Sequence, residues 1–107
     1  MRVGIVGCGR VADHHLKHLQ RTSSAQVVGL ADSDAENLRR LGDKYGITNL
    51  HSSLDAMLQS TAVDVVHICT PPFDHFSLAQ TAIRRGVHVL VEKPIAFNAA
   101  EVAQLYK

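Results

Sequence analysis

Residues 3–12 read Val3-Gly4-Ile5-Val6-Gly7-Cys8-Gly9-Arg10-Val11-Ala12, an apolar run that leads directly into the pattern G-x-G-x-x-A. The run predicts a buried strand, and the residues after it predict a helix. Gly7 permits a tight turn, Gly9 leaves room for a phosphate near backbone N–H groups, and Ala12 allows close packing of helix on strand. Because helix N-termini attract anions, Gly7–Ala12 is the predicted pyrophosphate site of a dinucleotide-binding fold.

An acidic residue, Asp32, closes the next apolar run, over residues 27–31. A carboxylate at that strand end can accept hydrogen bonds from ribose hydroxyls and repels a 2′-phosphate, so Asp32 and its neighbour Ser33 predict a site that favours NAD over NADP. Two alternatives stay open. Asp32 would also serve as the N-cap of the following helix. Arg39 and Arg40 on that helix could meet the 2′-phosphate of NADP, although an ordinary solvent-exposed face explains them as well.

Apolar runs and helical patterns alternate along the rest of the chain. We expect strands over residues 3–6, 26–31, 49–51, 63–69 and 87–91, and helices over residues 10–21, 33–45, 53–59 and 74–85. On the first helix, Val11, His15, Leu16 and Leu19 lie close to one face, which predicts that they are buried. The alternation predicts an α/β fold of the Rossmann type, a parallel sheet of strand order 3-2-1-4-5 with helices on both faces.

The last residues predict the start of another helix without a strand after it. Asn98 and Glu101 form a capping-box-like start, and Lys107 follows soon after. We therefore expect residues 1–107 to be a single NAD(P)-binding domain that is truncated before its sixth strand. The strand over residues 87–91 would then be an exposed edge, which predicts a homo-oligomer.

Composition excludes several classes of partner. The formal net charge is +1 and no basic run occurs, which argues against a nucleic acid or an anionic membrane surface. No apolar stretch approaches the ~20 residues of a membrane span. The first strand begins directly after Met1, which leaves no room for a signal peptide and predicts a cytoplasmic protein. Cys8 and Cys69, each at the end of a buried strand, are expected to pack as reduced thiols.

Seven histidines raise the question of a metal site. His14, His15 and His18 share a helix at spacings of three and four, but no further ligand falls at a matching spacing. No metal is therefore expected. His67 and His88 fall within strands and are expected to pack in the core or at its rim.

Two further motifs follow the fourth and fifth strands, Cys69-Thr70-Pro71-Pro72-Phe73-Asp74-His75 and Glu92-Lys93-Pro94. Together with the glycine turn and Gly86-Val87-His88-Val89-Leu90-Val91, they resemble the glucose–fructose oxidoreductase, inositol dehydrogenase and rhizopine-catabolism family (Gfo/Idh/MocA). The resemblance covers the whole chain.

The resemblance implies an NAD(P)-dependent oxidoreductase that acts on CH–OH groups of sugars, polyols or related alcohols. In that family the substrate pocket lies in a C-terminal domain, so the resemblance implies that this chain alone binds cofactor without turnover. Its implied catalytic residue is Lys93, near the nicotinamide and substrate. The implied cofactor-binding residues are Gly7, Cys8, Gly9, Arg10, Val11, Ala12, Asp32, Ser33, Thr70, Pro71, Pro72, His75, Glu92, Lys93 and Pro94.

The residues leave alternatives to these roles. Lys93 could polarise a hydroxyl at the nicotinamide or simply pair with Glu92, and His75 could touch cofactor or cap its helix. A non-catalytic dinucleotide sensor remains the second functional hypothesis. A methyltransferase that binds S-adenosylmethionine at the glycine turn is the third, but it leaves the motifs after the fourth and fifth strands unexplained.

Overall fold

The computed structural model describes residues 1–22, 24–70 and 75–91. Strands and helices alternate as predicted, and their ends differ from the predicted ends by at most two residues. The elements are β1 (Arg2–Val6), α1 (Arg10–Leu19), β2 (Gln26–Ala31), α2 (Ala35–Tyr45), β3 (Leu50–His51), α3 (Leu54–Ser60), β4 (Val65–Ile68), α4 (His75–Arg84) and β5 (His88–Val91).

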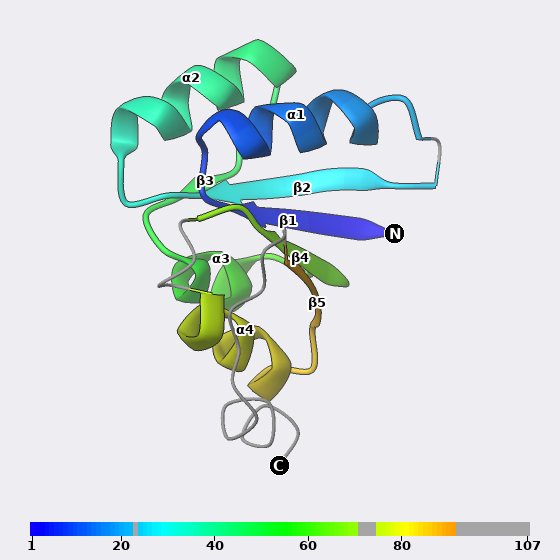
Figure 1. Ribbon diagram of the computed structural model, residues 1–107, viewed down its shortest axis with the longest axis vertical. Helices are drawn as coiled ribbons and strands as arrows, with labels where there is room; N and C mark the ends of the chain where they lie inside the picture. Colours follow the sequence, from blue (N-terminus) through cyan, green and yellow to red (C-terminus); the bar gives the residue numbers. More distant parts are fainter. Residues whose placement is uncertain (23, 71–74, 92–107) are drawn as a thin grey trace.

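The five strands form one parallel sheet in the order β3-β2-β1-β4-β5, which confirms the predicted Rossmann-type topology. Helices α1 and α2 lie on one side of the sheet, and α3 and α4 lie on the other (Figure 1). Because all strands are parallel, their carboxyl ends meet at one edge. The strand order reverses between β1 and β4, and ligands of open α/β sheets bind at that point of the edge.

The core beneath α1 and α2 follows the helical spacing of the sequence. Leu38 and Leu41 of α2 are buried there, and Ala12 and Leu16 of α1 are fully buried. The prediction for Val11 is wrong, because this side chain is 43% exposed. Residues four apart share a helix face, so Ala12 and Leu16 define the buried stripe and Val11 lies beside it.

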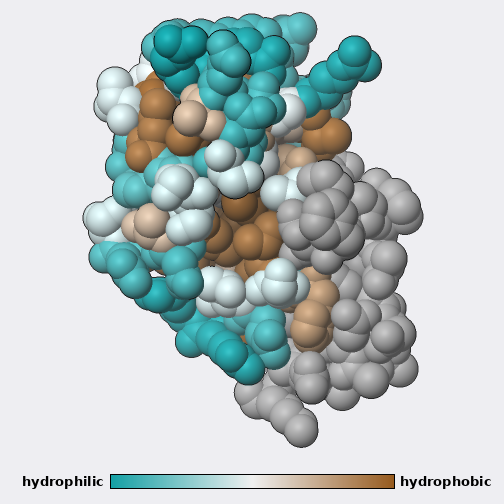
Figure 2. Space-filling model, turned by 90° about the vertical axis from the view of Figure 1, so that its left-hand side faces the viewer, coloured by the Kyte–Doolittle hydropathy of each residue, from teal (hydrophilic) through white to brown (hydrophobic). Residues whose placement is uncertain are grey.

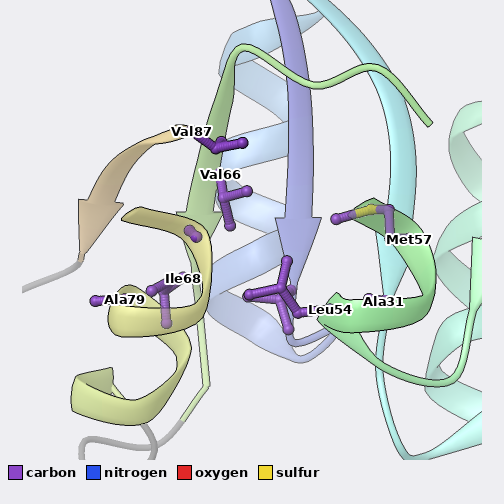
Figure 3. Close-up of a cluster of buried hydrophobic side chains, with 9 residues drawn as sticks. Ala31, Leu54, Met57, Val66, Ile68, Ala79 and Val87 are labelled. Atoms are coloured by element: carbon purple, nitrogen blue, oxygen red, sulfur yellow. The ribbon is translucent and has the colours of Figure 1, made fainter. Parts of the chain in front are cut away.

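A second core fills the space between the sheet and helices α3 and α4. In Figure 3, Leu54 and Met57 of α3 and Ala79 of α4 surround the strand residues Val66 and Ile68. Glycines of the sheet make room for Met57. A Cβ atom on Gly4 would lie 2.7 Å from the methyl carbon of Met57, so α3 sits close to β1.

Two helices begin with side-chain caps. Asp34 accepts hydrogen bonds from the N–H groups of Glu36 and Asn37 at the start of α2, and Ser53 accepts one from Ala56 at the start of α3. Gly46, with φ +69° in the left-handed region, is the C-cap of α2. Within the described part of the chain, no helix is long and apolar enough to cross a membrane.

Candidate dinucleotide site

The glycine turn joins the ends of three strands. Gly7 has φ +93°, and a Cβ atom there would lie 2.7 Å from the carbonyl carbon of Cys69 and 2.8 Å from the nitrogen of Thr70. Its own N–H donates to the carbonyl of Ala31 at the end of β2 (2.8 Å). Only glycine fits both the left-handed backbone and this contact. The turn after β1 therefore packs directly on the chain that leaves β4.

The start of α1 offers unoccupied hydrogen-bond donors. Its N-cap is Gly9, which has no side chain to accept from the first turn, whereas the caps described for α2 and α3 are Asp34 and Ser53. The first N–H groups of an α-helix have no partner within the helix. Among the described residues, a Cβ atom on Gly9 would meet nothing within 4 Å, so open space lies beside Gly9 at the start of the helix. This arrangement suits an anion such as a pyrophosphate.

Asp32 is held beside that turn by two backbone donors. Its Oδ2 accepts from the N–H of Cys8 (2.7 Å), and its Oδ1 accepts from the N–H of Asp34 (2.9 Å). The alternative that Asp32 caps α2 is wrong, because the N-cap is Asp34. Asp32 directly follows Ala31, the last residue of β2, and lies two residues before the N-cap. The carboxylate therefore belongs to the site at the strand ends.

Cys8 takes part in this site through its backbone. Its side chain is 1% exposed, and burial together with the charge of Asp32 raises the pKa of the thiol to about 12. The thiol therefore stays protonated at neutral pH. It packs in the core as predicted, while the N–H of Cys8 anchors Asp32.

A cavity of about 230 Å³ lies at the carboxyl edge of the sheet, between β1, β2 and the start of α4. Figure 2 shows this side of the molecule, with hydrophobic residues at the bottom of a hollow and paler, more polar residues beside it. The cavity is smaller than the roughly 300–1,000 Å³ of whole-ligand pockets, so it suits one part of a dinucleotide. It is lined by Val6, Gly7, Asp32, Ser33, Ser52, Ser53, Leu54, Thr70, Ser77 and Leu78.

Six of these lining residues were not predicted as site residues, and one of them, Val6, is the last residue of β1. Ser52, Ser53 and Leu54 follow the short strand β3, and Ser77 and Leu78 lie in the first turn of α4. None of these five belongs to a recognisable motif. Their position at the carboxyl ends of parallel strands was the available signal, because loops at that edge form the ligand site in open α/β sheets.

Thr70 and His75 are joined by a short hydrogen bond across the start of α4. His75 is 3% exposed, and its Nε2 lies 2.6 Å from the carbonyl oxygen of Thr70. Among the described residues, neither the Thr70 hydroxyl nor the His75 Nδ1 atom has a partner, although both atoms are buried. Thr70 lines the cavity as expected, whereas His75 lies behind Thr70, outside the set of described residues that line it.

The remaining predicted site residues divide into two groups. Arg10 and Val11 are exposed on the first turn of α1, next to the Gly9 N-cap. The others lie outside the described residues, and for them the prediction stays a prediction. These are Pro71, Pro72, Glu92, Lys93 and Pro94.

The histidines of α1 form ring contacts. The ring centroids of His14 and His18 are 4.7 Å apart, and those of His15 and His67 are 5.3 Å apart. In residues 1–22, 24–70 and 75–91, no three His, Cys, Asp or Glu side chains converge as a metal site.

Comparisons with known proteins agree with this geometry. A family model described as an oxidoreductase family with an NAD-binding Rossmann fold matches residues 1–107. The D-apiose dehydrogenase of Paraburkholderia graminis is 35% identical over 97 residues, which cover 91% of this chain and 26% of that protein.

Two solved structures show the same fold at TM-scores of 0.89. One is the WlbA dehydrogenase of Bordetella pertussis in complex with NADH and UDP-GlcNAcA, 30% identical over 97% of this chain and 32% of that chain. The other is a mutant of KijD10, a 3-ketoreductase of Actinomadura kijaniata, in complex with TDP-benzene and NADP, 27% identical over 99% of this chain and 33% of that chain. The chain thus spans about a third or less of the length of each relative.

Proposed function

Because this chain belongs to the oxidoreductase family with an NAD-binding Rossmann fold, we propose that its described site holds the adenosine diphosphate half of a nicotinamide dinucleotide. The observation that carries the proposal is the position of Asp32. Its carboxylate is tied to the N–H of Cys8, one residue from the uncapped N-terminus at Gly9. A ribose acceptor and a phosphate site are therefore adjacent, as they must be for an adenosine diphosphate.

The described residues fit the parts of that ligand. The open space in front of Gly9 would admit the pyrophosphate to the donors of α1, and Asp32 would accept from the adenosine ribose. Leu54 and Leu78 line the adjoining cavity and would cover the adenine ring. The buried Thr70 hydroxyl lacks a partner among the described residues, which a bound ligand would supply.

The charges around Asp32 favour NAD over NADP. A 2′-phosphate at the ribose would lie beside the carboxylate and be repelled. The two arginines of α2 are already engaged near their own helix: Arg39 lies 3.7 Å from Glu36, and Arg40 donates to Asn37 at 2.9 Å. The alternative in which they bind a 2′-phosphate would require both contacts to break.

We propose that the whole protein is a dehydrogenase for sugars, polyols or related alcohols, as the names of its relatives suggest. A bound nicotinamide supplies the acceptor or donor of the hydride. Lys93, by its place in the Glu92-Lys93-Pro94 motif, would orient or deprotonate the reacting hydroxyl. The chain spans a minor part of its relatives, so we propose that a separate domain provides the substrate pocket and that this chain alone binds without turnover.

A competition experiment with the two halves of the cofactor tests the proposed site. NADH fluorescence reports binding to the 107-residue chain, and ADP-ribose and nicotinamide mononucleotide are added as separate competitors. We expect ADP-ribose to displace NADH and nicotinamide mononucleotide to displace little of it, because the described residues hold the adenosine half. Equal competition by the mononucleotide would contradict the assignment. Displacement by S-adenosylmethionine would favour the methyltransferase hypothesis instead.

A further inference from the structure

We propose that His75 is a positioning residue, whose Nε2–H holds the carbonyl of Thr70 and thereby fixes the β4 wall of the cofactor cavity. A carbonyl oxygen can only accept a hydrogen bond, so the 2.6 Å contact requires the hydrogen of the imidazole on Nε2. This inference rests on the proposed dinucleotide site. It assigns His75 a role behind the cavity rather than in contact with the cofactor.

The bond acts on Thr70, a residue that borders two parts of the site. Thr70 lines the cavity directly. The nitrogen of Thr70 and the carbonyl of Cys69 also lie where a Cβ atom on Gly7 would clash, so the Gly7 turn packs on the peptide group that precedes the Thr70 carbonyl. A rotation of the Thr70 backbone would therefore change both the cavity wall and the support of the phosphate-binding turn.

The burial of His75 makes the bond difficult to replace by water. The side chain is 3% exposed, and a carbonyl that loses a buried partner is left without a hydrogen bond. His75 is also the first residue of α4, the helix that brings Ser77 and Leu78 to the cavity. One hydrogen bond thus links two walls of the same cavity, at Thr70 and at the start of α4.

Two amide variants show whether residue 75 must only be polar or must also be long enough to donate to the Thr70 carbonyl. In His75→Gln the side-chain amide nitrogen extends as far as Nε2 and can still donate to Thr70. In His75→Asn the same group is one methylene shorter and cannot reach it. The exposed His18 on α1 offers a matched control, and His18→Asn is expected to change neither cofactor binding nor the spectrum near Gly7.

The experiment combines NMR spectroscopy and calorimetry on the full 107-residue chain. A long-range ¹H–¹⁵N spectrum of the parent chain reports the tautomer of His75 without any cofactor, and we expect the hydrogen on Nε2. The amide signals of Gly7 and Thr70 should shift in His75→Asn and return toward their parent positions in His75→Gln. The Kd for NADH should rise roughly tenfold in His75→Asn and about twofold or less in His75→Gln.

Three results would overturn the inference. The first is a hydrogen on Nδ1 alone in the parent chain. The second is a folded His75→Asn variant with unchanged Gly7 and Thr70 signals and parent-like NADH affinity. The third is a His75→Gln variant as impaired as His75→Asn, which would indicate direct contact by the imidazole. If the parent shows the Nε2 tautomer but binds no NADH, the proposed function itself has failed, and the cofactor-positioning role fails with it.

Discussion

The carboxylate of Asp32 accepts a 2.7 Å hydrogen bond from the backbone N–H of Cys8, so the segment that follows β2 is bonded directly to the glycine turn after β1. The second oxygen of the same carboxylate accepts from Asp34, the residue that caps α2. The Asp32 carboxylate, which is proposed to bind ribose, is thus held next to the start of α1, which is proposed to bind phosphate.

The variant Asp32→Asn should damage both stability and binding. An amide has one acceptor oxygen, so either Cys8 or Asp34 would face an NH₂ group, and we expect a loss of about 1–3 kcal/mol in the free energy of unfolding. NADH affinity should fall as well, and the preference for NADH over NADPH should shrink because the repulsive charge is gone. Urea unfolding and calorimetric titrations measure these effects. Asp34→Asn is the control, since Asn caps helices as well as Asp does, and an equal loss in that variant would contradict the assignment.

Alanine at the two glycines of the turn should separate folding from binding. Gly7→Ala introduces a Cβ atom 2.7 Å from the Cys69 carbonyl carbon at φ +93°, so we expect unfolding to become easier by about 2–5 kcal/mol. Gly9→Ala meets no atom within 4 Å, and its stability should stay within about 0.5 kcal/mol of the parent. Its NADH affinity should nevertheless fall roughly tenfold, because the methyl group occupies the space proposed for the pyrophosphate.

Thermal and chemical unfolding check the first part of this prediction, and NADH titration checks the second. A stable Gly9→Ala variant with parent-like NADH affinity would contradict the proposal that the pyrophosphate binds at the start of α1. Gly46→Ala is a useful comparison, because it also introduces strain, at φ +69°, but lies at the end of α2. It should lower stability and leave NADH affinity unchanged.

The contacts of Asp13 with α2 should make stability depend on pH at the acid end. Asp13 accepts hydrogen bonds from the Tyr45 hydroxyl and from Lys44 (2.9 Å), which lower the pKa of its carboxyl. A lowered folded-state pKa adds stability above the unfolded value of about 4, and this contribution is lost as pH falls through the folded-state value. Asp13→Asn should therefore be less stable than the parent at pH 6, by at most about 1 kcal/mol for such exposed groups.

Urea unfolding at a series of pH values measures this gap between the parent and Asp13→Asn. The gap should narrow as pH falls below about 4, where the Asp13 carboxyl of the unfolded chain begins to take up its proton while that of the folded chain is still charged. A gap that stays constant from pH 6 to pH 3 would contradict the role of the charge. Asp43→Asn, on the exposed side of α2, serves as the control for a general change in net charge.

The Cys8 thiol should resist alkylation. Burial and the neighbouring Asp32 raise its pKa to about 12, so the reactive thiolate is scarce at pH 8. In Cys69→Ala, which leaves Cys8 as the single cysteine, iodoacetamide should react only as fast as the protein opens. Bound NADH should slow the reaction further, because a ligand of the folded state suppresses opening. Mass spectrometry follows the labelling, and modification within seconds in the folded chain would contradict the buried thiol.

Most of the fold could be predicted from local patterns, whereas the site could be predicted only in part. The apolar runs and Gly7 specify the strands and the first turn, and parallel crossovers then leave few possible strand orders. The sequence does not show whether Val11 or its neighbour Ala12 faces the core, because this depends on how the helix is rotated about its axis. In the structure Ala12 is buried and Val11 is exposed, so the prediction for Val11 is wrong.

The two proposed uses of Asp32 could not be separated in the sequence, because an N-cap and a ribose ligand require the same kind of side chain. In the structure β2 ends at Ala31 and Asp34 is the N-cap of α2, which excludes Asp32 as the cap. Ribose binding by Asp32 stays a prediction. The contact between His75 and Thr70 had no sequence signal at all.

A calorimetric titration of the parent chain with NADH, and separately with NADPH, tests the dinucleotide site most directly. We predict saturable, one-to-one binding of NADH that is tighter than the binding of NADPH and that weakens in the stable Gly9→Ala variant. A chain that is folded by circular dichroism and binds neither nucleotide at millimolar concentration would contradict the assignment of this site.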